Sequence, residues 1–287
     1  MGSKPFTIAA FVLLAWSNIA SAALPPPTTL DFSGYQWNVR SGSGGPGPNN
    51  WSDQNVYVDP STGYLHLQLT YSNGSWYAAE LVSQQAFGFG TYQWQLQGQP
   101  TPLDPNVVFG MFNYGPPTLG PDGTNEIDIE FASFDTTGAT PTHGNWTVWP
   151  AVAGAPMSPT TQFSTAPAVG ANTQRFTWSS TQVAFQALSG ITDTNSGEYA
   201  NWTYAPSDYL NRIPQQAMPV HMNLWLLGGN APTDGQNVEV VVSSFKFTPL
   251  SPAPEPGSAP LMTAGICVVW AANRRRKNTN ALKSSSA

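Results

Sequence analysis

The chain of 287 residues contains one cysteine, Cys267, and only 9% of its residues are charged. Because Cys267 lies in the C-terminal tail, the preceding domain has no disulfides, and a hydrophobic core must hold it together. Residues that favour helices are not arranged at a helical period, whereas 26 glycines and 27 prolines suit many short strands joined by turns. The composition therefore favours an all-β fold.

Basic residues are scarce as well, and most of them lie near the chain ends. Between positions 28 and 250, 15 acidic residues stand against 4 basic ones, a balance of −11. A surface with this charge repels phosphate backbones. We therefore expect no nucleic acid among the partners of this protein.

Long hydrophobic runs are also missing, since Phe6–Trp16 and Leu261–Ala272 both fall short of the ~20 residues that a comfortable membrane span needs. Residues 1–23 combine Lys4, the first apolar run and small residues before a cleavage point, which predicts a secretory signal peptide. A buried N-terminal helix is the alternative, and the prolines at 25–27 disfavour it. We expect the protein to be exported.

The C-terminal end has three parts in order: a proline-rich linker at 251–257, an apolar segment within 258–277, and the basic cluster 274–277. This order resembles the bacterial PEP-CTERM sorting signal. The resemblance implies an exosortase as partner, transient anchoring in the membrane through 258–277, removal of the tail during sorting, and a final location in the cell envelope, at the surface or outside the cell. The basic residues indicate that the polar end at 278–287 stays on the cytoplasmic side. An ordinary disordered tail is the alternative.

Residues 28–250 form the expected domain, which reads as roughly a dozen short strands separated by turn signals. This pattern predicts a sandwich or jelly roll of two antiparallel sheets. We expect Ser41–Pro48 to be a loop and Ser189–Tyr209 to be a surface insertion. The predicted strands are Val56–Asp59, Tyr64–Thr70, Ala78–Ser83, Phe87–Leu96, Val107–Phe112, Glu126–Ser133, Asn145–Trp149, Thr173–Trp178, Gln182–Leu188, Val220–Leu227 and Val238–Phe247.

One predicted strand alternates acidic and apolar residues. Side chains alternate between the two faces of a strand, so Glu126, Asp128 and Glu130 share one face and the intervening apolar residues share the other. Three carboxylates on one face repel each other, which indicates that the face has a use. A solvated edge strand with chance acids and a Ca²⁺ site are the alternatives.

Paired carboxylates are the groups that cleave glycosidic bonds. One protonates the leaving oxygen, and the other attacks the sugar or activates water. Asp128 lies between the two glutamates, and close like charges raise a carboxyl pKa, as a general acid at neutral pH requires. Positions four apart on a strand are about 13 Å apart at Cα, so the spacing alone does not establish retention of configuration.

Glu126–Glu130 resembles the Glu-x-Asp-x-Glu signature of glycoside hydrolase family 16. Two further stretches resemble that family: Ala79-Glu80-Leu81 with Phe89–Tyr92, and Met222–Trp225. The resemblance covers about residues 28–250 and implies a concanavalin-like β-jelly roll with retaining endo-hydrolysis or transglycosylation of β-linked polysaccharides. It implies Glu126 as nucleophile, Glu130 as general acid/base and Asp128 as their partner, with the cleft lined by Glu80, Asn223 and Trp225.

The spacing between Asp128 and Glu130 resembles lichenases and xyloglucan-active members of the family more than laminarinases or agarases. Two stretches depart from the family pattern: Thr124-Asn125 where lichenases have Trp-Asp, and Ala187–Gly190 where Tyr-Val-Asp-Gly is common. These departures leave the choice of substrate open.

Some residues outside the motif are candidates for sugar binding. Aromatic rings stack on sugar faces, so Trp51 is a candidate wall of a subsite, and Asn49 is a candidate hydrogen-bonding partner. Core packing is the alternative for the tryptophan. His66, His143 and His221 show no metal-ligand spacing, and we expect each to be structural.

The sequence as a whole predicts an exported glycosidase acting on β-glucan or a similar polysaccharide. We expect no required cofactor and a monomer, and a structural Ca²⁺ is left open. A non-catalytic carbohydrate-binding protein on the same fold and a structural envelope protein are the alternatives.

Overall fold

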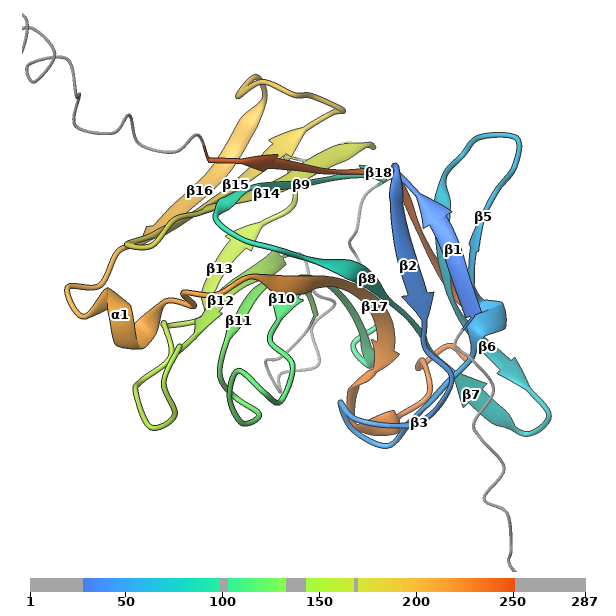
Figure 1. Cartoon of the computed structure of the whole chain (residues 1–287). Helices are drawn as coiled ribbons and strands as arrows, with labels where there is room; N and C mark the ends of the chain where they lie inside the picture. Colours follow the sequence, from blue (N-terminus) through green and yellow to red (C-terminus); the bar gives the residue numbers. More distant parts are fainter. Residues whose placement is uncertain (1–27, 99–102, 133–142, 168–169, 251–287) are drawn as a thin grey trace, which may run out of the picture.

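The structure is a computed structural model, and it describes residues 28–98, 103–132, 143–167 and 170–250 (Figure 1). The predicted signal peptide and the predicted C-terminal linker, sorting tail and polar end lie outside these ranges and stay predictions. Within the described residues, no helix is long and apolar enough to cross a membrane.

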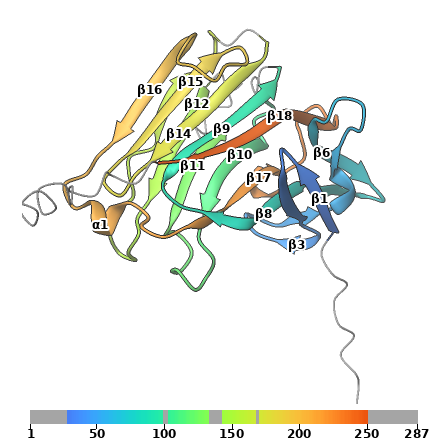
Figure 2. The same cartoon turned by 45° about the horizontal axis from the view of Figure 1, so that its top comes forward.

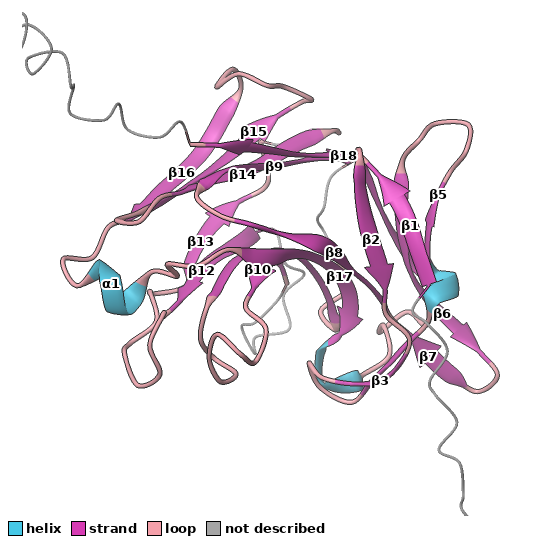
Figure 3. Cartoon of the chain, in the orientation of Figure 1, coloured by secondary structure: helices cyan, strands magenta, loops and turns pink. Residues whose placement is uncertain are grey.

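Nearly all regular structure in the described residues is β-strand (Figure 3). Helical structure is confined to single turns at Asp53–Asn55 (η1), Tyr209–Arg212 (α1) and Leu227–Gly229 (η2). The all-β prediction is confirmed.

One antiparallel sheet, which we call the cleft sheet, carries the acidic strand. In spatial order it contains β1 (Thr28–Phe32), β2 (Tyr35–Val39), β8 (Ala79–Phe87), β17 (Met218–Leu226), β10 (Val107–Tyr114), β11 (Glu126–Phe131), β12 (His143–Trp149) and β13 (Thr161–Ser164).

The second antiparallel sheet, which we call the back sheet, packs against the first, and in Figure 2 its strands are seen side by side. In order it contains β16 (Glu198–Tyr204), β15 (Val183–Ser189), β14 (Asn172–Trp178), β9 (Gly90–Gln97), β18 (Val238–Pro249), β6 (Leu65–Ser72) and β5 (Val56–Val58), with β7 (Ser75–Tyr77) paired to β6. The short strands β3 (Gly42–Gly44) and β4 (Asn49–Trp51) form a separate ladder.

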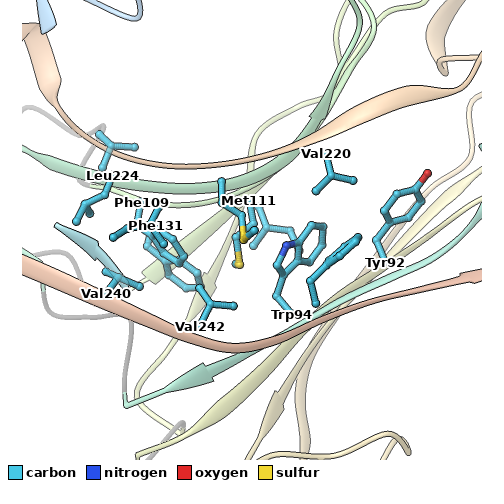
Figure 4. Close-up of a cluster of buried hydrophobic side chains, with 14 of the residues drawn as sticks. Tyr92, Trp94, Phe109, Met111, Phe131, Val220, Leu224, Val240 and Val242 are labelled. Atoms are coloured by element: carbon cyan, nitrogen blue, oxygen red, sulfur yellow. The ribbon is translucent and has the colours of Figure 1, made fainter. Parts of the chain in front are cut away.

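The core fills the space between the two sheets (Figure 4). Phe109, Met111 and Phe131 face inward from the cleft sheet, and Trp94 and Val242 face them from the back sheet. Burial of these side chains supplies the main driving force that holds the sheets together without disulfides. The sandwich is a jelly roll of two antiparallel sheets, as predicted.

The predicted strand Phe87–Leu96 is wrong as one element, because the chain changes sheets within it. Strand β8 ends at Phe87 in the cleft sheet, and β9 begins at Gly90 in the back sheet. A Cβ at Gly90 would lie 2.4 Å from the Phe247 ring, so glycine lets the new strand pack closely. The hydroxyl of Tyr92 donates to the Gly88 carbonyl at 2.6 Å and fastens the turn.

Two further predictions need correction. The predicted surface insertion Ser189–Tyr209 contains β16, which pairs with β15 at the edge of the back sheet. Most residues of β16 are partly or fully exposed, so apolar and polar residues do not alternate clearly along this strand. The predicted loop Ser41–Pro48 contains the three residues of β3.

Candidate active site

The floor of the site is strand β11. Ile127, Ile129 and Phe131 face the core with no exposed surface, which fixes the strand between β10 and β12. Glu126 and Glu130 therefore project from the opposite face of the cleft sheet. The alternation predicted this arrangement.

Strand register brings the predicted cleft residues into one row across the sheet. Glu80 pairs with Asn223, Asn223 with Gly110, and Gly110 with Glu130. A Cβ at Gly110 would lie 2.6 Å from Asn223 Oδ1, so the glycine leaves room for the amide. Asn223 Oδ1 is buried and receives no hydrogen bond from the described residues. It is an acceptor available between Glu80 and Glu130.

A cavity of about 610 Å³ lies over this row. Its volume falls in the range of small-molecule binding sites. The residues that line it are Arg40, Gly45, Pro46, Glu80, Val82, Phe112, Tyr114, Asp122, Glu126, Glu130, His221, Asn223 and Trp225. The sequence named Glu80, Glu126, Glu130, Asn223 and Trp225 among these.

Asp128 is buried between the two glutamates and does not itself line the cavity. The indole nitrogen of Trp149 donates to Asp128 Oδ2 at 2.8 Å. Oδ1 receives no hydrogen bond from an N–H or hydroxyl donor of the described residues. Since Asp128 also interacts with the Glu126 side chain, a proton shared between these two carboxyls would satisfy both.

Burial raises the pKa of every member of the acidic trio, and repulsion from neighbouring carboxylates adds to this for Glu126 and Asp128. Burial raises the pKa of Glu126 to about 8, with a further contribution from the charge of Glu130. Burial alone raises the pKa of Glu130 to about 7. Burial and both neighbouring charges raise the pKa of Asp128 well above its usual range. The trio therefore holds protons near neutral pH, so it can supply an acid and a carboxylate together.

One wall of the cavity carries a charged cluster. Glu80 accepts a hydrogen bond from Arg40 at 2.5 Å and contacts Nδ1 of His221 at 3.0 Å. Burial acts to raise the pKa of Glu80, but hydrogen bonds from His221 and Arg40 and the charge of Arg40 outweigh it and hold the pKa below its usual value. Glu80 is therefore ionised at neutral pH.

The structure places Asn49 and Trp51 behind the cavity, not on its surface. The Asn49 amide bonds the carbonyls of Pro46 and Leu226 and the Leu226 N–H, so it fastens the loop to β17. The Trp51 indole donates to Gly44, and one ring face is covered by Arg40 at 4.2 Å. Both residues support Gly45 and Pro46, which do line the cavity.

Asn125, which departs from the lichenase pattern, has a structural role at the start of β11. It has a positive φ of 55°, a conformation that asparagine tolerates better than most residues. Its amide donates to the carbonyls of Leu119 and Ala151, and its backbone bonds Gly115 and Pro150. These bonds fix the loop that carries Asp122 beside the cavity.

Sequence reasoning missed several residues of the cavity. Phe112, Tyr114 and His221 alternate with core residues on β10 and β17, so they resemble ordinary sheet positions. Tyr114 donates to Asp122 at 3.1 Å; burial, with the charges of Asp122 and Glu126, raises its pKa to about 12. The positions of Phe112, Tyr114 and His221 beside the acidic strand could have indicated that these residues line the cavity, but only once the order of the strands in the sheet was known.

No group of three or more His, Cys, Asp or Glu side chains in the described residues is arranged to hold a metal ion. His143, His66 and His221 come from three different strands, and the last two contact Glu239 and Glu80 respectively.

Comparison of the sequence with protein-family models and with curated proteins finds no match. Solved structures with similar folds do exist. The β-glucanase of Bacillus licheniformis is 23% identical with a TM-score of 0.55, over 75% of this chain and 92% of that one. The laminarinase of Flavobacterium sp. UMI-01 is 16% identical with a TM-score of 0.55, over 74% and 92% of the two chains.

A third similar structure is that of the immunostimulatory antigen and pseudo β-1,3-glucanase of Mycobacterium tuberculosis. It is 18% identical with a TM-score of 0.54, over 75% of this chain and 91% of that one. At such identities the likeness establishes the fold. This chain has the jelly-roll fold of β-glucanases and laminarinases, and a shared fold does not by itself determine the chemistry of a site.

Proposed function

We propose that this chain is a retaining endo-glycosidase that hydrolyses or transfers O-glycosidic bonds of a β-linked polysaccharide, with β-glucan as the substrate class. The observation that carries the proposal is the placement of Glu126 and Glu130 at the floor of a cavity of about 610 Å³, with Asp128 buried between them. The β-glucanase and laminarinase with the same fold support the choice of substrate class.

The reaction proceeds in two displacements. Protonated Glu130 gives its proton to the glycosidic oxygen while the Glu126 carboxylate attacks the anomeric carbon, which breaks the glycosidic bond and forms a glycosyl ester. Ionised Glu130 then takes a proton from water, or from an acceptor hydroxyl, which attacks the ester and releases Glu126. The proton that Asp128 and Glu126 share stays on Asp128 during the attack, so that Glu126 reacts as a carboxylate, and the two groups share it again once the ester is broken.

The test is replacement of each glutamate by its isosteric amide. Glu126→Gln and Glu130→Gln should each lower reducing-end release from lichenan, laminarin or xyloglucan by about 1,000-fold. Glu239→Gln is the matched control, because Glu239 lies on the back sheet and contacts His66 and Gln68, outside the cavity. It should leave activity unchanged. Product of inverted anomeric configuration would contradict the retaining mechanism.

A second candidate function is carbohydrate binding without catalysis. The protein of Mycobacterium tuberculosis that is named a pseudo β-1,3-glucanase has a similar fold. The same polysaccharide panel, extended with agarose, decides between the two. If wild-type protein binds a glucan and cleaves none, the lectin function replaces the enzyme.

The location of the protein is a proposal that rests on the sequence. We propose that it is exported and reaches the cell envelope, the surface or the medium after an exosortase processes the tail at 258–277. Fractionation of cells that carry the full chain, with and without residues 251–287, tests this proposal. Retention of both forms in the cytoplasm would contradict it.

A further inference from the structure

Two histidines of this chain have nearly the same immediate surroundings. Nδ1 of His221 lies 3.0 Å from Glu80 Oε1, and Nδ1 of His66 lies 3.0 Å from Glu239 Oε1. Each imidazole also stacks on an aromatic ring, at centroid distances of 4.9 Å for His221 and 4.7 Å for His66. What differs is the location. His221 lines the cavity, and His66 lies on the back sheet.

The partner of His221 fixes which ring nitrogen carries hydrogen. Glu80 is ionised and accepts from Arg40 through Oε2, so its Oε1 is an acceptor. Nδ1 of His221 must then donate to Oε1, because two acceptors facing each other at 3.0 Å would repel. In the neutral imidazole this leaves Nε2 without hydrogen.

The rest of the ring is held by aromatic neighbours. Phe112 stacks on the His221 ring with an interplanar angle of 24°, and Tyr114 meets it at 84° with centroids 5.9 Å apart. The Tyr114 hydroxyl is used by Asp122. Among the described residues, no group is hydrogen-bonded to Nε2 of His221, and this atom is not among the fully buried unpaired polar atoms.

The sheet register sets the distance of His221 from the reacting groups. His221 pairs with Phe112, and Phe112 pairs with Asp128. Two steps between neighbouring strands are roughly 10 Å, which is too far for contact with the reacting bond. A contact between His221 and a bound substrate would therefore lie outside the reacting bond.

We propose that His221 is a substrate-binding residue whose Nε2 accepts a hydrogen bond from a hydroxyl of a neutral sugar unit adjacent to the cleavage point. The proposal rests on the function proposed above and adds a residue that the sequence assigned to structure. Glu80 and Arg40 help to position His221. Arg40 lies over Trp51 and bonds Glu80, and Glu80 sets the tautomer of the histidine.

Three variants separate binding from structural support. His221→Phe keeps the stacking and loses both nitrogens, and His221→Asn keeps a donor near the Nδ1 position and loses Nε2. Both should raise KM about 3- to 10-fold with a much smaller change in kcat, since one neutral hydrogen bond is lost away from the reacting bond. His221→Gln, whose amide reaches the Nε2 position, should recover part of the loss.

His66→Phe is the matched control, since it removes the same contacts to a glutamate and an aromatic ring outside the cavity. Its KM should equal that of the wild type. If His221→Asn also has the wild-type KM, His221 only supports Glu80 and the proposal is wrong.

Long-range proton–nitrogen spectra test the proposal without turnover. The expected spectrum shows His221 with hydrogen on Nδ1, and addition of β-1,3- or β-1,4-linked glucotetraose shifts its Nε2 resonance while His66 stays unchanged. Hydrogen on Nε2, or an unmoved Nε2 signal in protein that binds and cleaves glucan, overturns this proposal alone. Protein that neither binds nor cleaves any glucan overturns the proposed function and this proposal with it.

Discussion

The Trp149 indole nitrogen donates a hydrogen bond of 2.8 Å to Asp128 Oδ2, from the strand next to the acidic one. It is the one bond to the Asp128 side chain from an N–H or hydroxyl donor in the described residues. By holding Oδ2, Trp149 leaves Oδ1 as the oxygen available to Glu126. The indole therefore sets which way the central carboxyl of the trio faces.

Trp149→Phe should change the pH dependence of activity. The indole bond lowers the pKa of Asp128, so its loss raises that pKa further, and the acidic limb of kcat/KM should move to higher pH. We expect kcat/KM at the optimum to fall roughly 10-fold, as for loss of a hydrogen bond to a charged group. Trp76→Phe, on β7, is the control. An unmoved pH profile in Trp149→Phe would show that the indole only packs.

Glu130→Gln should stabilise the fold at neutral pH. Burial raises the pKa of Glu130 from 4.5 to about 7, so the folded state resists ionisation of this carboxyl. The free-energy cost of ionising Glu130 in the folded state is absent below pH 4.5 and grows as the pH rises toward 7. The amide should therefore gain up to about 2 kcal/mol in free energy of unfolding at pH 8 and nothing at pH 4. Thermal unfolding at both pH values measures this, and an equal gain at both would contradict the assignment.

Gly110→Ala should disturb Asn223. The new Cβ would lie 2.6 Å from Asn223 Oδ1, and overpacking of this kind costs about 1–3 kcal/mol. Gly88→Ala is the control, because a Cβ there has no neighbour within 4 Å. In an Asn223→Ala background the Gly110→Ala cost should shrink, as denaturant unfolding of the four proteins of the cycle can measure. Additive costs would show that the two side chains do not compete.

Arg40→Met should destabilise the protein in a pH-dependent way. The pKa of Glu80 is lowered in the folded state, where Arg40 and His221 stabilise its carboxylate. The stability from a lowered pKa is present at neutral pH and is lost as pH falls through the folded pKa. We expect a loss of about 1–2 kcal/mol at pH 7, since Arg40 is partly exposed, and a smaller one below pH 4.

Lys246→Met is the comparison for Arg40→Met, because Lys246 pairs with Asp193 at 3.1 Å and both side chains are largely exposed. Its cost should stay below about 0.5 kcal/mol at any pH. Equal costs for the two variants in urea unfolding would contradict the role given to Arg40.

The acidic strand could be predicted from sequence because its signal is local. Alternation over six residues determines which side chains of β11 face the core, and Glu126 and Glu130 follow from it. The break between β8 and β9 could not be predicted, since it depends on Gly90 packing against Phe247. Phe247 lies on β18, which is next to β9 in the sheet but far from it in the sequence.

The cavity wall could not be predicted because its contacts are distant in sequence. Arg40 and Glu80 are 40 positions apart, and Glu80 and His221 are 141 apart. Asn49 shows the opposite error. An asparagine before a tryptophan suggested a residue that binds sugar. The Asn49 amide instead donates to the carbonyl of Leu226, 177 positions away, and this contact holds the loop against β17.

Strand β18 occupies a special place in the back sheet, since its first half pairs with β6 and its second half with β9. The contact between Gln68 and Glu239 spans 171 positions of the chain. During synthesis, β6 and β9 must therefore wait with open edges until almost the whole domain has been made, which favours slow folding and exposes edges that can pair with other chains. The last strand of the domain decides when the sandwich can close.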